Sequence, residues 1–186
     1  GTQVMGFAVL AIQQGKPHLV EMGAVKLTKE KDIYARLETI HRTITGLVKT
    51  HQPHLFAIEA PFFGKNIQSM LKLGRAQGVS IAAAMQTGIP VTEYAPKKIK
   101  QSITGNGNAD KDQVWKMLQH LLGLDTKPAG YDSSDALAIA YCHYLQQNKT
   151  LVAAVSNASP GKPNTKKKKN SWEDFLSAHP ERLKKP

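Results

Sequence analysis

Three carboxylates stand apart from the other acidic residues because of where they fall in the sequence. Glu59 follows the short apolar run 55–58, which predicts a buried parallel strand that ends at this residue. Asp132 and Asp135 lie three residues apart at the start of a predicted helix, so they share one helical face. Ligands of open α/β sheets bind at the C-terminal ends of strands, which makes the three acids candidates for one site. The structural alternatives are an exposed strand end for Glu59 and helix capping for the aspartates.

Clustered carboxylates of this kind suit the hydrolysis of a phosphodiester. Hard cations such as Mg²⁺ prefer oxygen ligands, and two of them about 4 Å apart activate the attacking water and stabilise the leaving oxygen. The apolar run 136–140 indicates a helix packed on a sheet, so the acids before it are expected to face a cleft. Such a site usually has a further acid on the first strand, and residues 4–12 contain none.

The overall charge favours a polyanionic partner. The chain has 25 Lys and Arg against 14 Asp and Glu, a net charge of +11, which favours nucleic acid over a basic surface without a partner. Cys142 is the only cysteine, so no disulfide framework is expected, and a reducing cytoplasm fits. Its sequence neighbours are helical and apolar, which predicts a buried thiol. No apolar run is long enough to span a membrane, and no signal peptide is recognised.

The pattern of apolar residues predicts an α/β fold with a mixed sheet flanked by helices. The expected order is strand, strand, helix, strand, helix, strand and three helices. The predicted elements are strands at 4–12, 18–27, 55–58 and 91–95, and helices at 32–50, 66–86, from Pro96, 111–122 and 132–147. Small residues in 66–86 would let another backbone approach that helix closely.

The C-terminal part differs in composition from the body. Residues 1–150 are predicted to form one nuclease domain, 151–170 a flexible lysine-rich linker, and 171–186 a short amphipathic helix or tail. Residues 151–186 hold eight basic and three acidic residues, so the tail is expected to add sequence-independent affinity for nucleic acid.

Five segments, in order along residues 1 to about 147, resemble the RuvC family of Holliday junction resolvases. Segment 57–66 is similar to the family's metal-binding Glu followed by an aromatic residue and Lys-Asn, and segment 69–78 to its interface helix. Segments 93–100 and 105–111 look like its two lysine-bearing segments, and 132–140 like its terminal acidic motif. Each motif alone is weak, whereas five in the family's order are specific.

The resemblance implies a ribonuclease-H-like fold, a homodimer and paired metal-dependent nicking of four-way junctions. It implies Mg²⁺, replaceable by Mn²⁺, with two ions per site held by Glu59, Asp132 and Asp135, and phosphate contacts from Lys100 and Lys111. It also implies a bacterial cytoplasmic enzyme that works with a branch-migration motor. The family's fourth acid would lie just before Gly1, so the N-terminus is expected to be truncated within the first strand and the chain to cleave poorly.

A second set of residues is expected to contact DNA around this site. It comprises Phe62, Phe63, Lys65, Asn66, Lys72, Arg75, Lys97 and Lys98. The phenylalanines would stack on or wedge bases near the junction centre, with core packing as the alternative. The alternatives for the whole chain are a non-catalytic junction-binding protein and a nuclease that acts on RNA-containing substrates.

Overall fold

The computed structural model describes residues 3–30, 32–61, 66–125 and 130–157, with side chains described as far as 148. The chain divides into two compact units, Gly1–Leu151 and Val152–Pro186. Of the second unit only 152–157 is described, as the backbone of a helix. Most of the predicted linker and all of 171–186 therefore lie outside the described residues.

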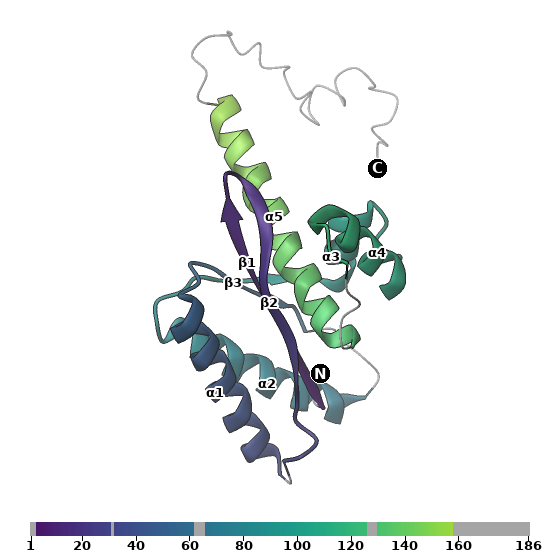
Figure 1. Cartoon of the computed structure of the whole chain (residues 1–186). Coiled ribbons are helices and arrows are strands. Elements are labelled where there is room, and N and C mark those ends of the chain that lie inside the picture. The colour runs from purple at the N-terminus through teal and green to yellow at the C-terminus, as the bar shows by residue number, and fades with distance from the viewer. Residues whose placement is uncertain (1–2, 31, 62–65, 126–129, 158–186) are drawn as a thin grey trace, which may run out of the picture. The chain divides into compact units, whose positions relative to one another are not determined.

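The element order is the predicted one (Figure 1). The elements are β1 (Val4–Gln13), β2 (Lys16–Lys26), α1 (Ile33–His51), β3 (Phe56–Glu59), α2 (Ile67–Met85), β4 (Val91–Tyr94), α3 (Pro96–Thr104), α4 (Lys111–Leu122) and α5 (Tyr131–Asn157). The last helix continues well beyond the predicted end at 147 and into the segment predicted as linker. The run 151–155 contains only apolar residues and no Gly or Pro, so nothing in it stops a helix.

The predicted mixed sheet is divided into two pairs of strands in the described part of the chain. β1 and β2 form an antiparallel hairpin that turns at Gln14 and Gly15, both with positive φ (51° and 76°). β3 and β4 are parallel, with Glu59 opposite Tyr94. The strand β3 is parallel as predicted, but it is half-buried instead of buried, because no further strand covers its other edge among the described residues.

Side chains that cap the helices fix where α1, α2 and α4 begin. Asp32 caps α1 and Asn66 caps α2, each accepting a hydrogen bond from a backbone N–H of the first turn. Asp110 and Gln113 form a capping box at α4. Because this box ends the loop after α3, it fixes the position of Lys111, the first residue of α4.

Two apolar clusters form the core. One joins α3, α4 and α5 and includes Leu118, Leu137 and Cys142, all fully buried. The buried Cys142 was predicted from its apolar neighbours. The second cluster joins α1 and α2 with Leu27 at the end of the hairpin. The start of α5 thereby lies close to the start of β1, where Gly6 meets the backbone of Asp132.

Candidate active site at the start of α5

Lys111 and Asp135 form the best-defined contact of the site. Lys111 Nζ donates a hydrogen bond to Asp135 Oδ2 over 2.6 Å, and both side chains are about half exposed (54% and 46%). The pKa of Lys111 is raised, first by this hydrogen bond and further by the negative charges of Asp135, Asp132 and Glu59, while partial burial opposes the shift. One ammonium group is thus within the field of all three predicted acids.

Glu59 occupies the C-terminal end of β3, as predicted. Partial burial raises the pKa of its carboxyl group, and the negative charge of Asp135 raises it further. The positive charges of Lys111 and Lys100 act in the opposite direction. Glu59, Asp135 and both predicted lysines therefore belong to one electrostatic neighbourhood, although they come from four separate elements.

Gly6 explains how β1 approaches the acids. A Cβ atom added to this glycine would collide with the backbone carbonyl group of Asp132. The strand therefore passes directly against the first turn of α5, a closeness that only glycine permits. The start of β1 is thereby fixed beside Asp132, and the sequence pattern gave no sign of this contact.

The acids fit a divalent cation by their chemistry. Carboxylate oxygens are the ligands that hard cations prefer, and the repulsion between Glu59 and Asp135 is of the kind that a bound cation relieves. Within the described ranges, however, no three acidic, His or Cys side chains already surround a common point. Binding a metal would require the side chains to turn, and Asp135 would have to leave Lys111.

The other predicted residues are distributed around this cluster. Lys72 and Arg75 are exposed on α2, and Lys98 is exposed on α3. Lys97 packs its aliphatic stem against Gly107, and Asn66 serves as the N-cap of α2 through a 3.0 Å hydrogen bond from Ser69 N. Phe62, Phe63 and Lys65 lie outside the described residues.

Two residues at the site were not predicted. Tyr131, next to Asp132 in sequence, places its ring 5.5 Å from Lys111 Nζ and donates a hydrogen bond to Asp112 Oδ1 over 3.1 Å. Gln77 of α2 donates to the backbone carbonyl group of Glu59 over 2.7 Å and so ties the end of β3 to α2. The sequence contains no signal that marks Tyr131 or Gln77 as a site residue, because Tyr and Gln serve many structural roles.

Comparison with known proteins identifies the family. The protein-family model described as crossover junction endodeoxyribonuclease RuvC matches residues 1–143 of this chain. The chain belongs to the RuvC family. Among curated relatives, RuvC of Bacteroides fragilis is 46% identical over 99% of this chain and 92% of its own length. RuvC of Porphyromonas gingivalis is 44% identical over 99% of this chain and 93% of its own length.

Solved structures of RuvC have the same fold. The structure of Thermus thermophilus RuvC matches with a TM-score of 0.73 and 30% identity, over 81% of this chain and 92% of that one. The structure of T. thermophilus RuvC in complex with Holliday junction substrate matches with a TM-score of 0.75, at the same identity and coverage. The ribonuclease-H-like fold expected from the sequence is confirmed.

Proposed function

We propose that this RuvC protein is a metal-dependent endodeoxyribonuclease that resolves Holliday junctions by paired nicking. The observation that carries the proposal is the convergence of Glu59, Asp132 and Asp135 with Lys111 at the start of α5. Its relatives are named crossover junction endodeoxyribonucleases, and one structural neighbour was solved with a Holliday junction substrate.

In this proposal the three acids hold up to two Mg²⁺ ions, which Mn²⁺ can replace. When bound, the ions supply an activated water and neutralise charge on the phosphate. Lys111 releases Asp135 and, with Lys100, contacts phosphate oxygens of the scissile strand. Tyr131 and the hydrogen bond from Gln77 to the Glu59 backbone position these groups and do not enter the chemistry.

Binding of the junction would use the basic surface around the site. Lys72, Arg75, Lys97 and Lys98 would contact the DNA backbone. Phe62 and Phe63 would stack on or wedge bases, and Lys65 and Asn66 would also contact the DNA. A homodimer through α2 would present two sites to the two strands that are nicked. We place this activity in the bacterial cytoplasm, in association with a branch-migration motor. No helix in the part of the chain that the structure describes is long and apolar enough to cross a membrane.

The decisive experiment is cleavage of a labelled four-way junction with Mg²⁺. Asp135→Asn removes a proposed ligand and should reduce cleavage by at least ~10²-fold while leaving junction binding within a few fold, because binding depends mainly on basic surface. Asp125→Asn, at an exposed aspartate outside the cluster, is the matched control and should cleave as the parent does. Equal cleavage by both variants would contradict the proposed site.

Two other outcomes of the cleavage assay would favour the alternative functions. Junction binding without Mg²⁺-dependent cutting would favour the non-catalytic alternative, and preference for an RNA–DNA hybrid would favour a ribonuclease.

A further inference from the structure

Lys111 occupies a place at Asp135 that a divalent cation would need. Its Nζ atom lies 2.6 Å from Asp135 Oδ2, and the negative charges of Asp132 and Glu59 also act on this ammonium group. An Mg²⁺ ion bound to the same carboxylate oxygen would lie about 2.1 Å from it. The two cations would then be less than about 5 Å apart and would repel each other. A metal ion and Lys111 therefore compete for Asp135.

The ion pair between Lys111 and Asp135 is open to solvent. Its two side chains are 54% and 46% exposed. Ion pairs with this exposure contribute little to folding stability, because water screens the charges and fixing two side chains costs entropy. Exchange of Lys111 for another cation at Asp135 should therefore leave the fold intact.

The backbone of Lys111 is fixed, so only its side chain has to move. In the capping box of α4, Gln113 N donates to Asp110 Oδ1 over 2.8 Å and Asp110 N donates to Gln113 Oε1 over 3.1 Å. The ring centroid of Tyr131 lies 5.5 Å from Lys111 Nζ, a distance at which the ring attracts an ammonium group. A Lys111 side chain that leaves its carboxylate partner thus stays at the site.

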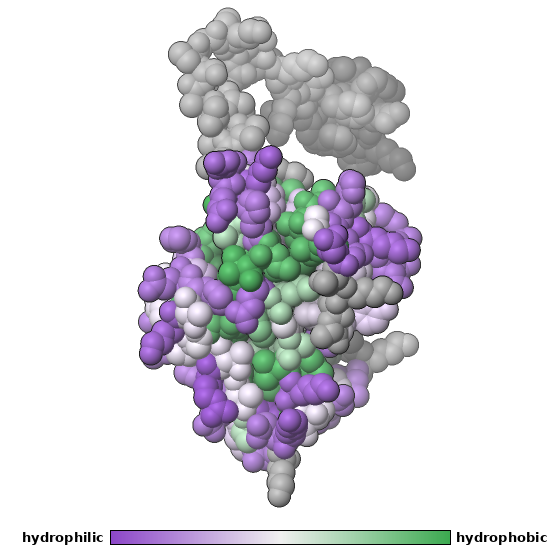
Figure 2. All heavy atoms as spheres, viewed as in Figure 1, coloured by the Kyte–Doolittle hydropathy of each residue, from purple (hydrophilic) through white to green (hydrophobic). Residues whose placement is uncertain are grey.

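A DNA phosphate is the acceptor that suits the released lysine. The helices α3 and α4 present a largely hydrophilic surface (Figure 2), on which Lys97, Lys98 and Lys116 are exposed. Lys111 belongs both to this surface and to the site, because it is the first residue of α4 and contacts Asp135. A phosphate brought onto the surface would give the ammonium group a new anionic partner. Transfer of Lys111 to that phosphate would free Asp135 for a metal ion.

We propose that Lys111 is an exchangeable counter-ion that couples metal binding to DNA binding. It neutralises Asp135 while both ligands are absent, and it moves to a DNA phosphate when a divalent cation takes its place. This inference rests on the proposed function, which assigns the metal to the acids and the phosphate to the substrate. Each ligand removes an obstacle to the other, and thermodynamic linkage makes the effect reciprocal. The protein without DNA should therefore bind metal ions weakly, which restricts metal-dependent cutting to the DNA-bound state.

The first test measures binding of Mn²⁺ alone to the full chain, without DNA, from the loss of the free-ion signal in electron paramagnetic resonance. Lys111→Met removes the competing charge, so this variant should bind Mn²⁺ at least about fivefold more tightly than the parent. Lys100 acts on Glu59 through its charge. Lys100→Met therefore reports the effect of charge alone and should raise the affinity less. Lys116→Met, at an exposed position of α4, is the matched control and should bind Mn²⁺ as the parent does.

The second test measures the coupling from the side of the DNA. The affinity for a labelled four-way junction is measured by anisotropy with and without Ca²⁺, which takes the same oxygen ligands, at constant ionic strength. For the parent, Ca²⁺ should tighten junction binding at least about threefold, because it releases Lys111 to the DNA. In Lys111→Met this gain should shrink, since only the neutralisation of the acids remains. Lys116→Met should keep the full gain.

Three results would overturn the coupling and leave the proposed metal site standing. These are a Mn²⁺ affinity of Lys111→Met that is equal to or weaker than that of the parent, equal effects of Lys111→Met and Lys100→Met, and an equal gain from Ca²⁺ in Lys111→Met and the parent. A failure of every form to bind Mn²⁺ would differ from these results. It would contradict the metal site of the proposed function itself, and the coupling with it.

Discussion

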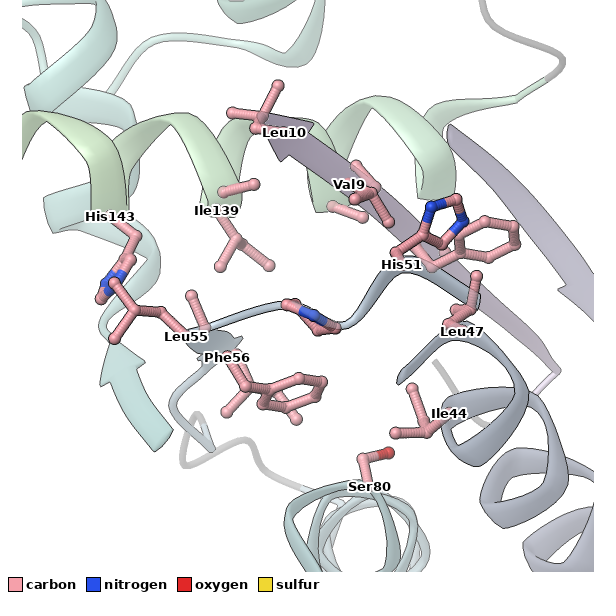
Figure 3. Close-up of a pocket in the computed structure, with 18 of the residues that line it drawn as sticks. Val9, Leu10, Ile44, Leu47, His51, Leu55, Phe56, Ser80, Ile139 and His143 are labelled. Atoms are coloured by element: carbon pink, nitrogen blue, oxygen red, sulfur yellow. The ribbon is translucent and has the colours of Figure 1, made fainter. Parts of the chain in front are cut away.

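Two faces of α5 meet different surroundings. On one face Leu137, Ala138 and Cys142 are buried among side chains of α3 and α4. On the other face Ala136 and Ala140 are half-buried and line an apolar groove of about 790 Å³ between β1 and β3, which we call the β1–β3 groove (Figure 3). One helix therefore has a closed side, where packing stabilises the fold, and an open side, where space remains. The acids of the candidate site lie at the end of the open side, since Asp132 and Asp135 also line the groove.

The largest contrast should appear when side chains are shortened. Leu137→Ala removes a fully buried side chain from the closed core and should lower the free energy of unfolding by about 2–5 kcal/mol. Leu47→Ala shortens the same residue type where it borders the groove, and should cost about 1 kcal/mol, because less contact is lost. Urea unfolding of both variants measures the difference. Equal losses would mean that the groove side is packed as tightly as the core.

A glycine pair tests the close contact between β1 and α5. Gly6→Ala forces β1 away from Asp132 and should cost about 1–3 kcal/mol of unfolding free energy, with reduced junction cleavage as well. Gly78→Ala, in the middle of α2 with open space around it, should instead stabilise the fold by up to about 1 kcal/mol. The melting temperatures of Gly6→Ala and Gly78→Ala should therefore shift in opposite directions from that of the parent protein. Loss of dimerisation in Gly78→Ala would support α2 as the interface between copies.

Enlarging two alanines of α5 compares its faces directly. Ala138→Leu adds volume to the closed core, where the side chain is 3% exposed, and should destabilise the protein by about 1–3 kcal/mol. Ala140→Leu extends into the groove and should be neutral or stabilising by about 1 kcal/mol. The melting temperatures of the two variants should move apart. If Ala140→Leu destabilises as much as Ala138→Leu, the groove is closed in solution.

The smallest effect concerns the buried His143, whose Nδ1 lies 2.8 Å from the Tyr94 hydroxyl oxygen. Burial lowers the pKa of this imidazole from 6.5, so the unfolded chain takes up its proton at a higher pH than the folded chain. The free energy of unfolding should therefore fall as the pH drops below about 6.5, by at most ~1.4 kcal/mol per pH unit. His143→Gln should show a shallower pH dependence in urea unfolding. An unchanged slope would assign it to other histidines.

The sequence determined the order of the elements and the identity of the acids. The apolar pattern identified the order of the helices and strands because local spacing determines which side chains share one face of an element. Glu59 was placed at a strand end and Asp132 with Asp135 on one helical face for the same reason. The five ordered motifs then indicated the family, which the comparisons confirm. The roles of the individual residues remain predictions.

Only the tertiary structure decided how these parts meet. The ion pair between Lys111 and Asp135 joins residues far apart in sequence, and the contact of Gly6 with Asp132 depends on how β1 crosses α5. The burial of β3 was overestimated because its apolar residues predict a covered strand but cannot reveal which neighbour provides the cover. An apolar sequence predicts that a strand is buried. The packing of the whole chain determines whether another element covers that strand.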